Sequence, residues 1–210
     1  MKTLRQTLLV LVCLLVAGCF DLDEKITLHD DGSAQIELNW SAEKARADLA
    51  SDLQTAASGQ AGGLGFFDEK AMRNYLAKIP GVEIDVARCW EKDQVRHGRA
   101  ILQVKDLRAA LKAGLLPRTT LNFDKKTGLW TLEMKPDADL DRKAFPPSEA
   151  EAIRQIRMKL CFEVPGELIS HNGHSKDGDK VTWEFGPQRS LLGAPRAFTA
   201  SFKSDKLKKP

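Results

Sequence analysis

Residues 25–40 read KITLHDDGSAQIELNW, and this stretch decides the fold class. Two runs of strand-forming residues, 25–29 and 34–40, flank the sequence DDGS, whose Asp and Gly residues favour a tight reversal. In the second run Ile36 and Leu38 share one face, as they would in a half-buried strand. The stretch therefore predicts a β-hairpin.

The rest of the chain continues with short strands and inserted helices. Ser41 is predicted to cap a helix over 42–55, and Asp68 to cap a helix over 68–78. Such runs of strands indicate an α+β fold, mostly antiparallel sheet with inserted helices. We expect a single domain over 25–203 and a disordered basic tail over 204–210. The further strands are expected at 82–90, 99–104, 119–123, 130–134, 159–164, 180–185 and 196–202, and the further helices at 107–113 and 148–157.

The first 18 residues, MKTLRQTLLVLVCLLVAG, have the plan of a secretory signal peptide. Lys2 and Arg5 precede a continuous apolar run over 8–17, which closes on small residues. Ten helical residues reach only about 15 Å, half of the roughly 30 Å hydrocarbon core of a bilayer. We therefore expect this segment to be cleaved and not to span a membrane permanently.

The sequence Val16-Ala17-Gly18-Cys19 resembles the lipobox of bacterial lipoprotein precursors. The resemblance implies cleavage between Gly18 and Cys19 and acyl chains such as palmitate on Cys19, with 19–24 as the anchor and a short linker. Because one acyl chain holds a protein only weakly, two or three would make the attachment persistent. Phe20 stands where an inner-membrane retention signal is usually Asp, which implies the periplasmic face of the outer membrane. The alternative is an ordinary secretory peptide that leaves Cys19 as a structural thiol.

A second resemblance concerns the layout of the mature chain. A strand close to Cys19, the DGS turn at 31–33 and the late strand sequence Thr182-Trp183-Glu184-Phe185 are similar to those of a group of uncharacterised envelope lipoproteins. The resemblance covers the first 25 or so and the last 50 or so residues of the mature chain. It implies a membrane-anchored envelope domain and supplies no catalytic residues.

Two further cysteines, Cys89 and Cys161, remain in the mature chain. Export to an oxidising compartment favours a disulfide between them. By alternation, Cys161 shares a face with Glu163, and Cys89 has the parity of Glu83 and Asp85. We therefore expect both thiols on the polar face of a sheet, bonded to each other; two unpaired thiols are the alternative.

The stretch 59–67, GQAGGLGFF, is a candidate contact loop. Glycines around Leu64, Phe66 and Phe67 would let these side chains enter the bilayer near the anchor or dock on an envelope protein partner. The alternative is that Phe66 and Phe67 fold into the core, with Phe67 packing on Met72 as a helix staple.

Fragments that imitate catalytic or metal sites are better explained as turns and caps. Ser41-Ala42-Glu43-Lys44 and Lys126-Thr127-Gly128 fit motifs of penicillin-recognising enzymes, but the third motif of that set is missing. Imidazole and carboxylate groups at 171–179 would suit zinc, yet they fall among turn signals; we expect no cofactor and no metal. The residues concerned in that segment are His171, His174, Asp177 and Asp179.

The charge balance argues against a nucleic-acid partner. The chain has 32 basic and 29 acidic residues, and removing 1–18 leaves 30 against 29, interspersed and not gathered in a basic block. The sequence thus predicts a membrane-anchored envelope lipoprotein whose periplasmic domain is a binding or assembly module. An envelope enzyme acting on cell-wall or lipid substrates is the alternative.

Overall fold

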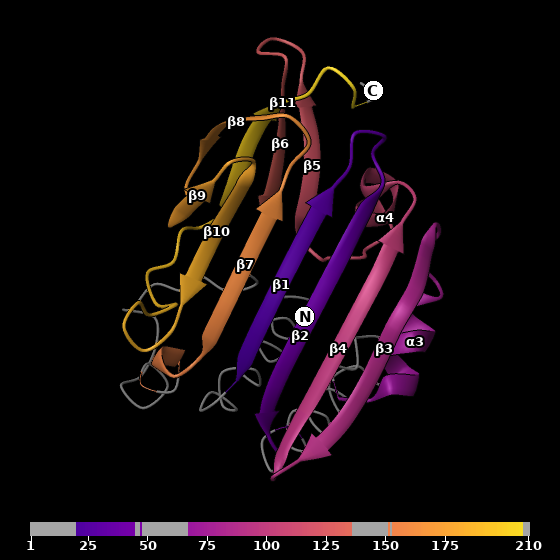
Figure 1. Ribbon diagram of the computed structural model, residues 1–210, viewed down its shortest axis with the longest axis vertical. Coiled ribbons are helices and arrows are strands. Elements are labelled where there is room, and N and C mark those ends of the chain that lie inside the picture. The colour runs from indigo at the N-terminus through magenta and orange to yellow at the C-terminus, as the bar shows by residue number, and fades with distance from the viewer. Residues whose placement is uncertain (1–19, 45–46, 48–66, 136–150, 152, 208–210) are drawn as a thin grey trace, which may run out of the picture.

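The computed structural model describes residues 20–44, 47, 67–135, 151 and 153–207. These residues form a seven-stranded sheet, a four-stranded sheet and the helices α3 (Glu69–Leu76) and α4 (Leu107–Lys112), as Figure 1 shows. The strands are β1 (Asp21–Leu28), β2 (Ala34–Glu43), β3 (Val82–Lys92), β4 (Val95–Val104), β5 (Thr119–Asp124), β6 (Leu129–Met134), β7 (Arg157–Glu163), β8 (Glu167–His171), β9 (Ser175–Asp177), β10 (Lys180–Phe185) and β11 (Phe198–Lys203).

The predicted hairpin at residues 25–40 is confirmed as β1 and β2. Ile26 pairs with Ile36 across the two strands, and both side chains are fully buried. Both strands are longer than expected, because β1 begins at Asp21 and β2 continues to Glu43. The prediction of Ser41 as a helix cap is wrong: Ser41 lies in β2, where His97 of β4 is its partner.

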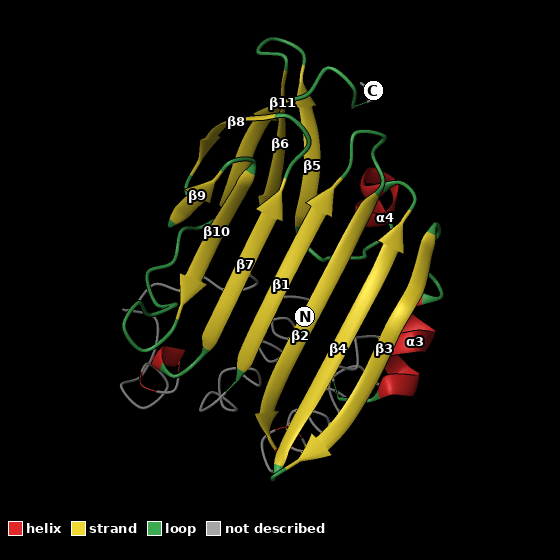
Figure 2. Ribbon diagram, in the orientation of Figure 1, coloured by secondary structure: helices red, strands yellow, loops and turns green. Residues whose placement is uncertain are grey.

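The seven-stranded sheet has the order β3-β4-β2-β1-β7-β10-β9, so β1 lies at its centre. β1 pairs in antiparallel fashion with β2 but in parallel with β7. A parallel pair needs a long crossover, which the chain between β1 and β7 provides. The sheet is therefore mixed. With β8 and β9, which are absent from the strands expected from the sequence, the fold is richer in strands than expected (Figure 2).

The four-stranded sheet, with the order β5-β6-β11-β8, lies behind the upper part of the seven-stranded sheet in Figure 1. Aromatic packing joins the two sheets, because Trp183 of β10 lies against Phe198 of β11 with ring centroids 5.7 Å apart. Within its own sheet Trp183 also packs edge-on against Phe162 of β7, at 4.9 Å. All three side chains are almost completely buried. The main core thus lies between the sheets.

Helix α3 begins where the sequence predicts. The side chain of Asp68 accepts a hydrogen bond from the Ala71 amide at 3.0 Å and so caps the helix. Met72 is fully buried, and Phe67, just before the cap, packs partly buried against the core. These positions are those of the predicted hydrophobic staple.

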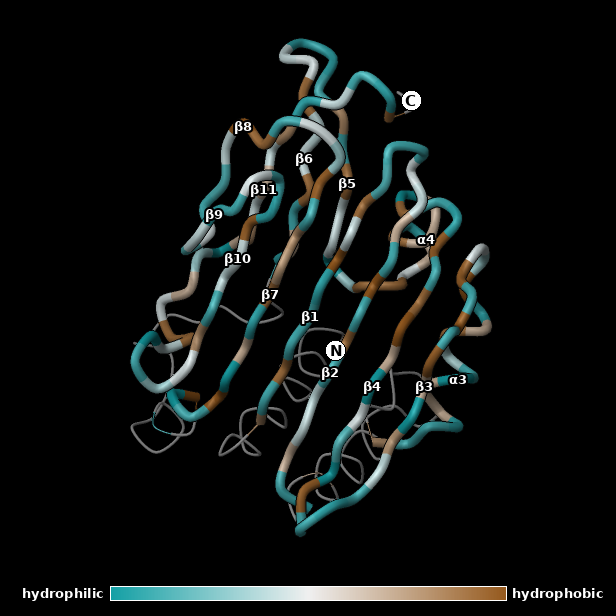
Figure 3. Tube along the Cα trace, viewed as in Figure 1, coloured by the Kyte–Doolittle hydropathy of each residue, from teal (hydrophilic) through white to brown (hydrophobic). Residues whose placement is uncertain are grey.

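Directly paired residues of a sheet share a face, so the register separates the two faces of the seven-stranded sheet. The core face carries Leu38, Glu24, Leu160 and Trp183, which are all buried. The outer face, which bears no strand of the second sheet, carries one row of Asn39, Asp23, Lys159 and Glu184. Figure 3 shows the resulting alternation of hydrophilic and hydrophobic residues along the strands.

A β-bulge in β3 reverses the alternation of that strand. The pairing with β4 skips Asp85, between Ile84 and Val86. Beyond the bulge, Ala87 and Cys89 lie on the core face and Val86 moves to the outer face. The prediction that Cys89 lies on the polar face is therefore wrong, because it assumed an unbroken alternation from Glu83 to Cys89.

The described part of the expected tail over 204–210, residues 204–207, packs against the domain. Leu207 is only 4% exposed, and its amide donates to the Ser204 hydroxyl at 3.2 Å. Lys206 forms an ion pair with Asp30 in the β1–β2 turn, with Nζ and Oδ2 2.8 Å apart. Residues 208–210 lie outside the described part of the chain.

Candidate functional site

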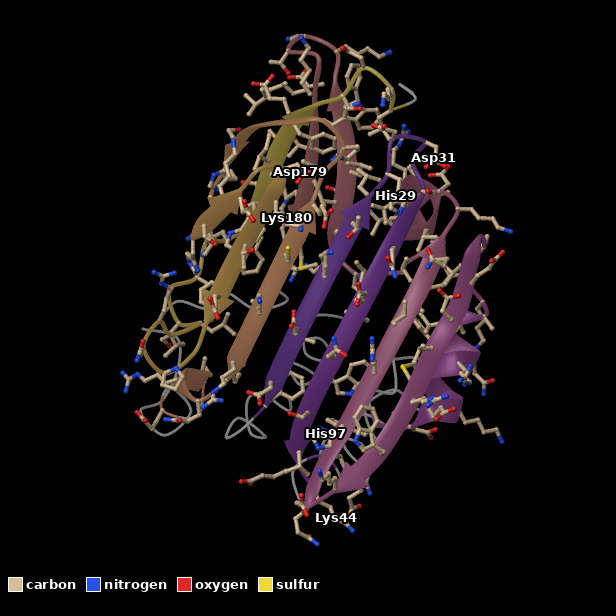
Figure 4. The ribbon with its side chains drawn as sticks, viewed as in Figure 1. His29, Asp31, Lys44, His97, Asp179 and Lys180 are labelled. Atoms are coloured by element: carbon tan, nitrogen blue, oxygen red, sulfur yellow. The ribbon has the colours of Figure 1, made fainter. Side chains whose placement is uncertain are left out.

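A trough of about 1010 Å³ crosses the outer face of the seven-stranded sheet at the end where β1 begins. We call it the anchor-end trough. Figure 4 labels His97 and Lys44 toward this end of the sheet, and His29 and Asp31 toward the opposite end. The side chains that line it from the outer face are Asp21, Asp23, Asn39, Ser41, Trp90, His97, Arg157, Lys159 and Glu184.

An aromatic pair forms one wall of the trough. The rings of Trp90 and His97, on the paired strands β3 and β4, stack with centroids 5.3 Å apart and planes 12° apart. Trp90 is 46% exposed, whereas Trp40, Trp130 and Trp183 are buried. This pair could not be predicted from the sequence, because only the register places Trp90 and His97 side by side.

The rest of the lining includes apolar residues such as Leu22, Met158 and Pro187, together with polar side chains whose charges balance. Ser41, next to His97 in the same row of the sheet, is a small residue whose hydroxyl donates weakly to Asp21, at 3.5 Å. Within the described residues, the side chains of Asp23 and Lys159 form no hydrogen bond or ion pair, and the same holds for Asn39. Three carboxylates and three cations line the trough: Asp21, Asp23, Glu184, Arg157, Lys159 and Arg189.

The trough lies close to the predicted lipidation site. Gly18 and Cys19 are outside the described residues, but Phe20 is described, and β1 begins at Asp21. The carbonyl of Phe20 accepts a hydrogen bond from the Arg157 amide at 2.9 Å, and its side chain packs against the core. From Cys19 to Asp21 the chain spans at most about 7 Å, since an extended residue covers roughly 3.4 Å.

The expected disulfide between Cys89 and Cys161 is absent from the structure, where both residues are described and neither is bonded to another cysteine. Cys89 lies in β3 and Cys161 in β7, with three strands between them. Four strand spacings amount to about 19 Å, whereas the Cα atoms of a disulfide lie within roughly 7 Å of each other. Because of the bulge in β3, the two thiols also lie on opposite faces of the sheet.

Burial sets the chemistry of Cys89. Desolvation, followed by the charges of Glu69 and Asp68, raises the pKa of its thiol to about 11. Since the thiolate is the reactive form, Cys89 is a poor nucleophile at neutral pH.

A buried carboxyl, Glu24, lies outside the trough on the core face of β1. It is 8% exposed, and its Oε1 has no hydrogen-bond partner within the described residues. Its paired neighbours are Leu38 and Leu160. Burial in these apolar surroundings raises the pKa of Glu24 from 4.5 to about 7.

The two fragments that imitate penicillin-recognising enzymes do not form one site. Ser41 is in β2 of the seven-stranded sheet, while Thr127 and Gly128 are in the turn between β5 and β6 of the other sheet. The Thr127 hydroxyl donates to Asp124 at 3.0 Å, and Gly128 has a positive φ of 71°. Turn geometry therefore accounts for this fragment.

The histidines of the candidate metal segment are engaged by the backbone. His171 Nδ1 accepts from the Gly173 amide at 3.1 Å, and His174 Nδ1 accepts from the Glu184 amide at 2.9 Å. Over the described part of the chain, no group of three or more His, Cys, Asp or Glu residues has the arrangement of a metal site.

The candidate contact loop falls mostly outside the described residues. Leu64 and Phe66 belong to the undescribed stretch 48–66, so the loop stays a prediction. Phe67 is described, and it packs partly buried against the core. None of the helices in the described ranges is both long and apolar enough to cross a bilayer.

Comparisons with known proteins give the fold and no family. No protein-family model matches the chain, and no curated protein is similar to it in sequence. Among solved structures, the folded domain of LppM from Mycobacterium tuberculosis, determined by NMR, has a TM-score of 0.50 and 14% identity. The match covers 90% of this chain and 91% of that chain. The chain therefore shares the fold of the LppM domain.

Proposed function

We propose that the protein is a bacterial envelope lipoprotein, anchored by acyl chains on Cys19, whose domain is a binding or assembly module at the membrane surface. The observation that carries the proposal is the start of β1 at Asp21, two residues after the cysteine of the lipobox-like sequence. A lipidated Cys19 would hold the seven-stranded sheet directly against the membrane, with the anchor-end trough beside it.

Confinement to a membrane layer is itself a functional property. An anchored domain meets other envelope components at a raised effective concentration, so a weak contact suffices for binding. The outer face of the sheet offers such a contact surface, because no strand of the second sheet covers its polar side chains. On this proposal the domain binds an envelope partner or ligand through that face.

Acyl labelling tests the anchor. In cells fed a palmitate analogue, the wild-type protein should be labelled and Cys19→Ala should be unlabelled and retain residues 1–18. Cys13→Ala, which changes a cysteine within the predicted signal peptide, is the matched control and should be labelled normally. Normal cleavage of Cys19→Ala would overturn the proposal.

The proposed location is the periplasmic face of the outer membrane. It follows from Phe20, at the position where Asp would act as a retention signal. Phe20→Asp should move the protein to the inner-membrane fraction, and Phe20→Leu, which keeps the apolar contact with the core, should not. Equal fractionation of both variants would contradict the proposed sorting.

A further inference from the structure

We infer that the anchor-end trough binds the pyranose rings of a saccharide. The inference rests on the proposed function, since an envelope module lies among glycans of the cell wall and of lipid headgroups. A pyranose ring has an apolar face of C–H groups and a rim of hydroxyls, and the trough offers a partner for each.

The stacked pair of Trp90 and His97 supplies the aromatic surface. An indole that is 46% exposed while three other tryptophans are buried leaves its apolar area open to a ligand. The stacking on His97 fixes the orientation of the ring before any ligand arrives. A ligand bound there therefore costs little side-chain entropy.

Polar side chains without partners supply the hydrogen bonds. Asp23, Asn39 and Lys159 are neighbours in one row of the outer face and form no side-chain hydrogen bond or ion pair in the described structure. A carboxylate, an amide and an ammonium group together accept from and donate to hydroxyls, which themselves do both. Because three carboxylates and three cations line the trough, the charge favours a neutral sugar over an anionic one.

The surroundings of Trp90 favour a saccharide over insertion into a bilayer. The β3–β4 hairpin continues beyond Trp90 through Glu91 and Lys92 and turns at Asp93 and Gln94. Glu91 also forms an ion pair with Lys44, with Oε1 and Nζ 2.9 Å apart. A bilayer approaching from this end would meet charged side chains first, and burying them in hydrocarbon is costly.

The first test is calorimetric titration of the purified, full mature protein in detergent with a tetrasaccharide of N-acetylglucosamine. We expect saturable binding with a dissociation constant of about 1 mM or tighter. The tryptophan emission should change in parallel, since Trp90 is the exposed tryptophan. Absence of binding in a protein whose acylation is verified would overturn the inference and leave the lipid anchor intact.

Variants locate the site. Trp90→Ala should weaken binding at least about tenfold and remove the emission change. Asn39→Ala, which retains Trp90 as the reporter, should also weaken binding and keeps the test valid if Trp90→Ala does not fold. Ile169→Ala on β8 is the control, because Ile169 is equally exposed, at 47%, but lies outside the trough. Equal affinity of all three variants would overturn the inference.

Experiments with vesicles distinguish the two sources of the sugar from each other and from the alternative, insertion of Trp90 into a bilayer. If vesicles of a neutral glycolipid compete with the tetrasaccharide, the ligand is a lipid headgroup. If only soluble cell-wall glycans compete with it, the ligand belongs to the cell wall. Both results support the inference. Quenching of Trp90 by brominated phosphatidylcholine, without sugar, would show bilayer insertion and overturn it. Cys19→Ala protein should still bind the tetrasaccharide, so a failure of the anchor and a failure of the sugar site are distinguishable.

Discussion

The indole Nε1 of Trp183 donates to two oxygens of Asn172, the backbone carbonyl and the side-chain Oδ1, each at 3.1 Å. The same Oδ1 accepts from the Thr199 amide at 3.0 Å, and Asn172 Nδ2 donates to the Ala197 carbonyl at 2.7 Å. Trp183 belongs to the seven-stranded sheet, and Thr199 to β11 of the four-stranded sheet. One short side chain thus connects the two sheets.

Replacing Asn172 should loosen this junction. Asn172→Ala removes three side-chain hydrogen bonds, so we expect the free energy of unfolding to fall by about 2 kcal/mol. Urea denaturation measures the change. Asn122→Ala is the control, since its amide makes a single exposed hydrogen bond, to Thr120. Similar losses for the two variants would argue against a special role of Asn172.

The buried Glu24 should make stability depend on pH. The carboxyl of Glu24 has a pKa of 4.5 in the unfolded chain and about 7 in the folded protein. Between these two pH values the folded state therefore holds one more proton than the unfolded state. The free energy of unfolding should therefore fall by roughly 3 kcal/mol as the pH rises from below 4.5 to above 7. Glu24→Gln should remove this decline, while Glu83→Gln, on the surface beside Lys105, should keep it. If the stability of the wild type depended on pH as little as that of Glu24→Gln, ionisation of the buried Glu24 would not destabilise the fold.

Gly98 leaves room for the indole of Trp40. A Cβ at Gly98 would lie 2.2 Å from two ring atoms of Trp40, so Gly98→Ala must displace a buried tryptophan. We expect a loss of about 1 to 3 kcal/mol and a shift of the Trp40 emission. Gly186→Ala is the control, because its Cβ would meet only Arg157 Cγ, at 3.8 Å. Unchanged thermal stability of Gly98→Ala would contradict the contact.

The absence of a disulfide between Cys89 and Cys161 predicts a labelling pattern. With a thiol pKa of about 11 in place of 9, Cys89 has about 100-fold less thiolate at pH 8, so its alkylation in the folded protein should slow accordingly. After denaturation without reductant, both Cys89 and Cys161 should react with iodoacetamide, as mass spectrometry would record. A pair that resists alkylation until reduced would reinstate the disulfide.

Local patterns predict the parts of this fold that local forces decide. The alternation over residues 25–40 and the cap at Asp68 are confirmed, because side-chain periodicity and capping act over a few residues. The cap expected at Ser41 is wrong, since pairing of β2 with β4 extends the strand through that position. The face predicted for Cys89 is wrong, because the bulge at Asp85 depends on the register of β3 with β4.

The trough was beyond reach of the sequence for a related reason. Its walls come from strands far apart in the chain, and the pairing of β1 with β7 joins Asp21 to Arg157. Trp90 by itself reads as one more aromatic residue in a strand. Only the strand order and register set it beside His97 and opposite the polar rows.

The central position of β1 has a mechanical consequence. The strand is hydrogen-bonded to β2 on one side and to β7 on the other, and the chain enters it at Asp21 with Phe20 already tied to Arg157. A pull on the N-terminus along the strand axis would load both ladders in shear, so that many hydrogen bonds must break together. An N-terminal tether of this kind resists force, because no edge strand can be unzipped one bond at a time.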